Sequence, residues 1–241
     1  MDGAAKILKY ELHDVLRSRW MIVYGLFFLT ITSVLFQFAG SHAKVILSLM
    51  NIVFIIIPLV SMIFGTMYLY QSREFIELLL CQPIQRKSIY AGMYVGLAVP
   101  LAVCFLAGAG IPFLFYGFQN QNDLLKFLVL MLSGTFLTFI FTSLAFLIST
   151  RQEDKTRGFG LSLLTWFFFS VIYDGVVLLA VYAFGDYPIE YPVIVLSLLN
   201  PIDLTRIFLL LRIDISALLG YTGAVFQNFF GSGAGMAVSL M

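Results

Sequence analysis

Five long apolar segments leave this chain little choice of fold. Each is close to or above the roughly 20 mostly apolar residues that an α-helix needs to cross a bilayer. They cover residues 21–39, 45–70, 90–117, 127–149 and 159–184. Helices satisfy their own backbone hydrogen bonds in lipid, so the pattern predicts an all-α polytopic membrane protein.

A sixth apolar segment begins near Gly235 and reaches the chain end at Met241. Its seven residues (235–241) would form about 10 Å of helix, against a hydrocarbon core of about 30 Å. We expect the incomplete start of a sixth span in a longer chain; the alternative is five spans with an outer C-terminus. The predicted organisation is a single transmembrane domain over 1–241: interfacial helix 1–20, spans 21–184, outer segment 185–234 and this start, 235–241.

The composition agrees with a protein whose main solvent is lipid. Hydrophobic residues make up 61% of the chain and charged residues 11%, whereas soluble domains carry about 25% charged residues. The net charge of +1 argues against a nucleic-acid partner, because nucleic-acid binding rests on a basic surface. The lipid bilayer is therefore the first partner that the sequence predicts.

Lysine and arginine predict the orientation of the spans, because cytoplasmic loops carry an excess of both. Four residues on one side of the predicted membrane are basic: Lys44, Lys126, Arg206 and Arg212. Ten lie on the other: Lys6, Lys9, Arg17, Arg19, Arg73, Arg86, Lys87, Arg151, Lys155 and Arg157. The sequence thus predicts a multi-pass protein of a bacterial inner membrane with a cytoplasmic N-terminus. Apolar residues recur at helical spacing in its first 20 residues, typical of an interfacial helix.

The connection between the second and third spans contains a predicted short helix over 73–80. Phe75, Leu78 and Leu79 are expected on one face, and Glu74 and Glu77 on another. Pro83 ends this helix, because the residue before a proline avoids the helical region. Two interpretations stay open: a helix that docks a soluble partner, or a hairpin that touches only lipid headgroups.

The outer segment 185–234 is too long for a simple connector. Asn200-Pro201-Ile202-Asp203 is typical of a helix start, with Asn as the cap, Pro at the first helical position and Asp in the first turn. A full span over 191–211 would bury Asp203 and Arg206 near its centre, at about 2.5–3.5 kcal/mol each. Two short re-entrant helices that pack on other spans fit better.

Asp174 lies midway along the fifth span. An ionisable group at this depth is either functional or a structural carboxyl paired with a neighbouring span. The pattern leaves both open.

The sequence carries no motif for bond-making chemistry. It has no GxxxxGK[ST] nucleotide-binding loop, no HExxH pair and no Ser/His/Asp set. Cys81 and Cys104 do not have the spacing of a metal site, and His13 and His42 fall on opposite sides of the predicted membrane. We therefore expect no catalytic residue, no metal site and no cofactor in this chain.

The order of these parts resembles the type-2 family of ABC transporter permeases. The shared order is an interfacial helix, two spans, IELLLCQPIQRKSIYAGMY, three spans and a long outer segment before span six. WFFFSVIYDGVVLL (166–179) and LNPIDLTRIFLLLRIDISALLGYTGAVFQNFFG (199–231) are more specific. They resemble the members of that family that serve maturation of nitrous-oxide reductase in denitrification.

The resemblance implies a six-span exporter-type (type V, ABC-2) domain that pairs as a homodimer, with spans one, two and five near the two-fold axis and weak support from Gly25 and Gly175. A cytoplasmic ABC ATPase dimer would bind and hydrolyse the ATP. A periplasmic β-helical protein would bind outside, and copper or a sulfur species would be the cargo for the copper centre of the reductase. The alternative is a stand-alone secondary transporter or channel, which several intramembrane charges or inverted repeats would favour.

Two sets of site residues follow from this resemblance. The residues expected to couple to the ATPase are Arg73, Glu74, Phe75, Glu77, Leu78 and Leu79. Those expected to dock the outer partner are Tyr187, Tyr191, Arg206, Arg212 and Asp214. Asp174 is the candidate intramembrane polar residue.

Overall fold

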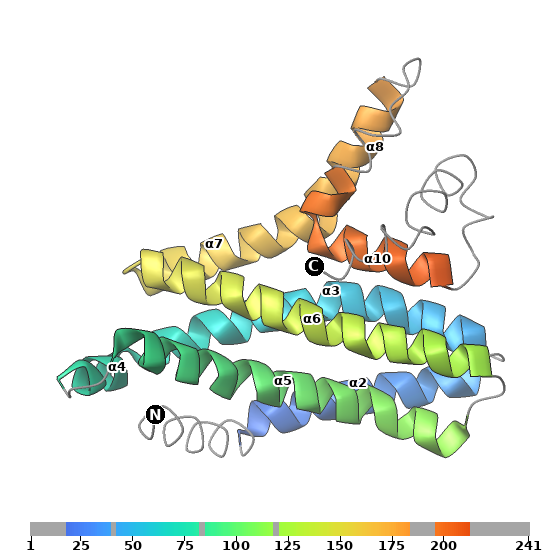
Figure 1. Ribbon diagram of the computed structural model, residues 1–241, viewed down its shortest axis with the longest axis horizontal. Coiled ribbons are helices and arrows are strands. Elements are labelled where there is room, and N and C mark those ends of the chain that lie inside the picture. The colour runs from blue at the N-terminus through green and yellow to red at the C-terminus, as the bar shows by residue number, and fades with distance from the viewer. Residues whose placement is uncertain (1–17, 40–41, 82–84, 118–120, 184–195, 213–241) are drawn as a thin grey trace.

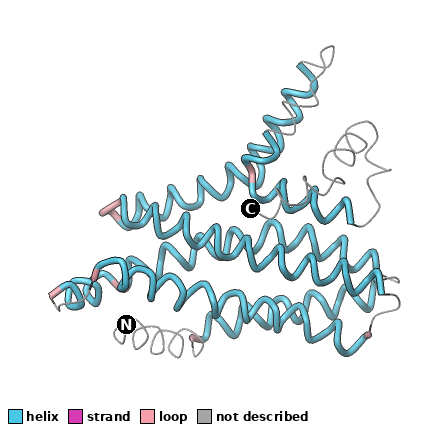
Figure 2. The backbone as a smooth tube through the Cα atoms, in the orientation of Figure 1, coloured by secondary structure: helices cyan, strands magenta, loops and turns pink. Residues whose placement is uncertain are grey.

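The computed structural model describes residues 18–39, 42–81, 85–117, 121–183 and 196–212. Helices joined by short turns make up these parts of the chain, and none of their residues lies in a strand (Figures 1 and 2). The helices are α2 (Arg19–Phe38), α3 (His42–Gln71), α4 (Arg73–Leu80), α5 (Arg86–Tyr116), α6 (Gln121–Arg151), α7 (Lys155–Phe167), the π-helix η1 (Phe168–Ile172), α8 (Tyr173–Ala183) and α10 (Pro201–Arg212).

Five helical segments of the described chain are long and apolar enough to cross a membrane. They are Arg19–Phe38, Lys44–Gln71, Arg86–Tyr116, Asp123–Arg151 and Lys155–Leu179. This confirms the predicted all-α polytopic fold and its first five spans. Most of the predicted interfacial helix and the start of the sixth span lie outside the described residues.

The spans pack as two pairs of helices that share one core. α2 packs along α5 and α3 packs along α6, while contact between α5 and α6 joins the pairs (Figure 1). The largest fully buried side chains include Phe28, Phe54, Phe105, Phe113 and Phe141. Because the bundle interior is filled by side chains in this way, the chain has a packed core and the functional residues must be sought at its ends and edges.

Gly25 lies at the contact between α2 and α5. A Cβ atom on Gly108 of α5 would be 2.4 Å from the Gly25 carbonyl oxygen, so the two backbones approach more closely than any side chain allows. Small residues permit this kind of approach between membrane helices. Gly25 therefore serves packing within one chain and gives no support to a homodimer.

The fifth span is one unbroken helical segment, as the sequence predicts, but it is not α-helical throughout. α7 packs along α3, but η1 interrupts the α-helical geometry, and α8 then diverges from the bundle (Figure 1). α10 packs against α6 and α3. A short helical piece, 196–199, precedes α10. This arrangement brings the polar start of α10 to the π-helical part of the fifth span.

Candidate functional site

α4 presents a mixed apolar and acidic face at one end of the bundle. Its bounds, Arg73–Leu80, are those that the sequence predicts. Ile76 and Leu79 are 6% and 8% exposed, whereas Phe75 and Leu78 are 44% and 68% exposed. Glu74 and Glu77 are also exposed. We call Glu74, Phe75, Glu77 and Leu78 the outer face of α4.

Leu79 does not share the face that the sequence predicts for it. Successive residues of an α-helix are about 100° apart, so Leu79 lies between Phe75 and Ile76 around the axis. The rest of the chain covers the Ile76 side, which buries Leu79 and leaves Phe75 exposed. Leu79 thus holds α4 on the bundle and is not on its outer face.

Arg73 is directed away from this outer face, toward the turn between α6 and α7. Its Nη1 donates to the Glu153 carbonyl and its Nη2 to the Gln152 carbonyl, each at 2.6 Å. A longer bond of 3.5 Å reaches the Ser149 carbonyl in the last turn of α6. A cation is favourable there, because the last carbonyls of a helix have no partner within it and carry partial negative charge.

Tyr70 supports the same turn from the end of α3. Its hydroxyl donates to the Gln152 carbonyl at 2.9 Å, and its ring lies 4.5 Å from the Arg73 guanidinium carbon. A Cβ atom on Gly158 would be 1.8 Å from the Tyr70 hydroxyl, so any side chain at that position of α7 would have to displace the Tyr70 ring. One turn further into the bundle, Thr66 and Ser162 bond through their hydroxyls at 2.6 Å.

A second polar cluster joins α8 to α10. The Asp174 Oδ2 atom accepts a hydrogen bond from Arg206 Nη1 at 2.7 Å, and Asp203 Oδ1 lies 3.5 Å from the same nitrogen. About a third of each of the Asp174 and Arg206 side chains is exposed. Asp174 is therefore a paired carboxyl, which is one of the two alternatives that the sequence left open.

Asn200 fixes the start of α10 to the π-helix. Its side chain is fully buried, and its Oδ1 accepts from the Ile202 amide at 3.1 Å, as its predicted role as helix cap requires. Its Nδ2 donates to the Phe169 carbonyl of η1 at 2.9 Å and to Asp203 Oδ2 at 3.0 Å. Tyr173 adds a hydrogen bond from its hydroxyl to the Leu196 carbonyl.

Of the residues predicted to dock an outer partner, the structure describes the side chain of Arg206 alone. Tyr187, Tyr191 and Asp214 lie outside the described residues, and the Arg212 side chain does as well. Arg206 is engaged by Asp174 and Asp203 within the chain. Sequence reasoning missed this ion pair, although two opposite charges at membrane depth were the available signal.

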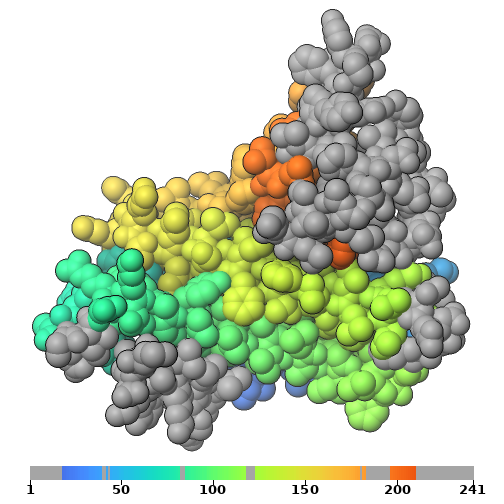
Figure 3. All heavy atoms as spheres, in the orientation of Figure 1, coloured from blue at the N-terminus to red at the C-terminus, as the bar shows by residue number. Residues whose placement is uncertain are grey.

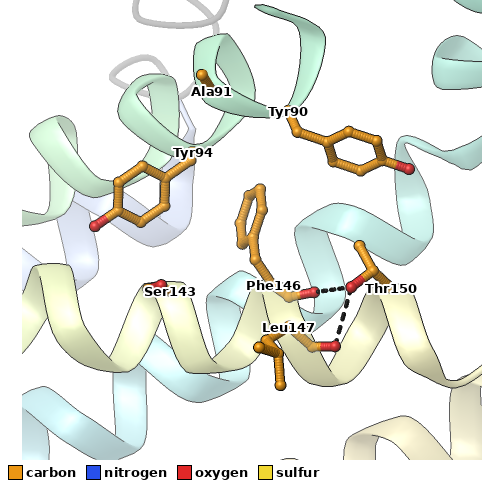
Figure 4. Close-up of a pocket in the computed structure, with 7 residues that line it drawn as sticks. All are labelled: Tyr90, Ala91, Tyr94, Ser143, Phe146, Leu147 and Thr150. Carbon is orange, nitrogen blue, oxygen red and sulfur yellow. Dashed lines mark hydrogen bonds between the residues drawn. The ribbon is translucent and has the colours of Figure 1, made fainter. Parts of the chain in front are cut away.

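A shallow groove of about 320 Å³ lies between α5 and α6 (Figure 4). Its lining residues are Tyr90, Ala91, Tyr94, Ser143, Phe146, Leu147 and Thr150. The Tyr94 hydroxyl donates to the Phe139 carbonyl and the Thr150 hydroxyl to the Phe146 carbonyl, each at 2.9 Å. No carboxylate, histidine or cysteine lines the groove. In the part of the chain that the structure describes, no three such residues gather closely enough to hold a metal ion.

Removal of the Arg206 charge is expected to weaken the attachment of α10. Arg206→Met leaves Asp174 and Asp203 beside each other without their cation. Breaking a buried pair costs about 3–5 kcal/mol; we expect about 2 kcal/mol here because both side chains are partly exposed. Unfolding of the purified chain in mixed micelles measures the loss.

Two further variants test that prediction. Arg206→Met combined with Asp174→Leu should recover part of the loss, since the carboxyl that lacks a partner is then also removed. Arg86→Met, at an exposed arginine, should change stability by no more than about 0.5 kcal/mol. An Arg206→Met variant as stable as the Arg86→Met control contradicts a stabilising ion pair.

Comparison with known proteins gives one family. The sequence pattern of the "ABC-2 family transporter protein" family matches residues 5–240. Two curated relatives, from Stutzerimonas stutzeri and Pseudomonas aeruginosa, are both described as "Probable ABC transporter permease protein NosY". Each is 28% identical to this chain; the alignments cover 99% and 88% of this chain and 86% and 82% of the relatives.

Proposed function

The chain belongs to the ABC-2 family of transporter proteins, as a multi-pass membrane subunit, and on this premise we propose that it is a permease for maturation of the copper centre of periplasmic nitrous-oxide reductase. A separate ATPase supplies the energy. The match to the family over 5–240 is the observation that carries the transporter part of this proposal. The resemblance of residues 166–179 and 199–231 to permeases of nitrous-oxide reductase maturation supports the proposed role in maturation.

The outer face of α4 is the proposed docking site for that ATPase. Phe75 and Leu78 are large apolar side chains exposed beside two carboxylates, Glu74 and Glu77. α4 and the α6–α7 turn reach the surface at the same end of the molecule (Figure 3). Basic residues concentrate at that end, including Arg73, Arg86 and Arg151, so it is the proposed cytoplasmic side.

The remaining partners are also part of the proposal. Two copies would pair through the spans that are least buried within one chain. In the most apolar stretches of α2 and of the fifth span, only 22% and 11% of the residues are buried. A periplasmic β-helical protein would bind the outer segment, and copper or a sulfur species would be the cargo. The chain itself would hold no cofactor. The alternative of a stand-alone transporter or channel was expected to show several intramembrane charges, and Asp174 is paired with Arg206.

Purification in mild detergent tests the coarse part of the proposal. A tagged chain is expected to carry a soluble subunit that is photolabelled by an azido analogue of ATP. The chain purified alone should show no labelling. A tagged chain that brings down no nucleotide-binding subunit contradicts dependence on a separate ATPase.

Removal of the chain from its host tests the finer part. The reductase is then expected to be exported but to lack copper at its catalytic centre, as metal analysis of the purified enzyme would show. A reductase with its full copper content would exclude this maturation role and leave the transporter assignment intact.

A further inference from the structure

We propose that Arg73 and Tyr70 couple α4 to the fourth and fifth spans, so that movement received at α4 is delivered to α7 as well as to α3 and α5. This inference rests on the proposed function of α4. The chain already connects α4 to α3 at one end and to α5 at the other. The additional connection, to the α6–α7 turn, is made by side chains.

The Arg73 guanidinium is suited to this role. Its two Nη atoms reach the carbonyls of adjacent residues, Gln152 and Glu153, at 2.6 Å each. A planar guanidinium holds two acceptors in fixed directions, whereas a lysine ammonium is a single point on a flexible stem. Because the acceptors are backbone atoms, displacement of Arg73 acts on the chain path of the turn directly.

The turn between α6 and α7 is too short to absorb such a displacement. Only residues 152–154 separate α6 from α7. The Asp154 carboxylate accepts from the Thr156 amide at 2.8 Å and caps α7, so the turn ends in a fixed helix start. Tyr70 bonds the Gln152 carbonyl and lies against Gly158, which ties the first turns of α7 to the end of α3.

Spin labels can measure the connection without any partner. Cys81 is exposed at the end of α4 and Lys155 is exposed at the start of α7. The Lys155→Cys variant, with Cys104→Ala to remove the other native cysteine, gives one labelled pair across the connection in each copy of the chain. In lipid nanodiscs the parent should show a narrow distribution of distances, and Arg73→Gln a wider one.

The same pair in complex with the ATPase tests the coupling. On addition of ATP, the parent pair should shift as one unit with little change in its mutual distance, while a label at residue 155 changes its distance to the ATPase. In Arg73→Gln the ATPase should still bind, because the outer face of α4 is intact, but the ATP-dependent shift at residue 155 should be lost. Arg73→Lys should recover only part of it.

Three variants make the outcome decisive. Tyr70→Phe removes only the hydroxyl bonds, and Gly158→Ala displaces Tyr70 without removal of a charge. Both should widen the distribution of label distances, and they replace Arg73→Gln if that variant fails to fold. Arg86→Gln changes an exposed arginine at the start of α5 and should behave as the parent. A parental distribution and a parental ATP-dependent shift in Arg73→Gln would overturn the inference. A parent chain that binds no ATPase would instead overturn the proposed function.

Discussion

A chain that carries Glu74→Lys and Glu77→Lys together is expected to insert normally and to lose its ATPase. Both carboxylates are exposed on the outer face of α4 and make no contribution to the bundle core. Like charges placed opposite each other across an interface cost several kcal/mol. A cost of about 3 kcal/mol weakens binding roughly a hundredfold, which a pull-down with the purified ATPase detects.

The size of this effect comes from reversing two charges at once. Single truncations at an interface exceed about 1 kcal/mol only at a few central positions, so Phe75→Ala or Leu78→Ala alone can be silent. The matched control is Glu74→Gln with Glu77→Gln, which removes attraction without adding repulsion and should bind more tightly than the reversal. If the reversed chain binds its ATPase with parental affinity, α4 contacts only lipid headgroups and the docking site must be sought in residues 150–158.

The second large effect is expected from Asn200→Leu, which keeps the size of the side chain and removes all of its hydrogen bonds. The part-buried Phe169 carbonyl of η1 and the buried Ile202 amide would then lose these partners. Each such group costs about 1–3 kcal/mol, so we expect a loss of about 2–4 kcal/mol. Unfolding in mixed micelles measures it, and faster hydrogen exchange over 201–212 would locate it at α10.

Asn200→Ser separates the two contributions. A serine hydroxyl can cap α10 but is too short to replace the bond to the Phe169 carbonyl, so this variant should lose less stability than Asn200→Leu. Equal stability of Asn200→Leu and the parent protein would show that the π-helix does not depend on this side chain.

Periodicity and hydropathy predicted the features that depend on local sequence. The five spans were found from length and apolar content, because a span must present an apolar surface to lipid over its whole length. The bounds of α4 followed from Pro83 and the change in residue type, and the cap at Asn200 followed from its neighbours in the chain. Each of these signals lies within a few residues of the element that it predicts.

The features that were missed depend on partners far away in the chain. Residue 200 bonds the carbonyl of residue 169, and Arg206 pairs with Asp174. Arg73 likewise appeared to belong with Glu74 and Glu77, because the sequence shows its charge but not the carbonyls of residues 152 and 153. A local pattern identifies which groups need a partner, and only the packing of the helices decides which partner they find.

The π-helix in the fifth span also determines how the side chains of α8, which follows it, are rotated about the helix axis. A π-helix closes its hydrogen bonds over one residue more than an α-helix does, and one residue corresponds to about 100° of rotation. The number of residues between Lys155 and Asp174, and not the chemistry of Asp174 alone, therefore determines whether a carboxylate points toward Arg206. If Phe168–Ile172 closed as ordinary α-helix with the same number of residues, α8 would be rotated about its own axis and would present a different side to α10, with every side chain of α8 unchanged.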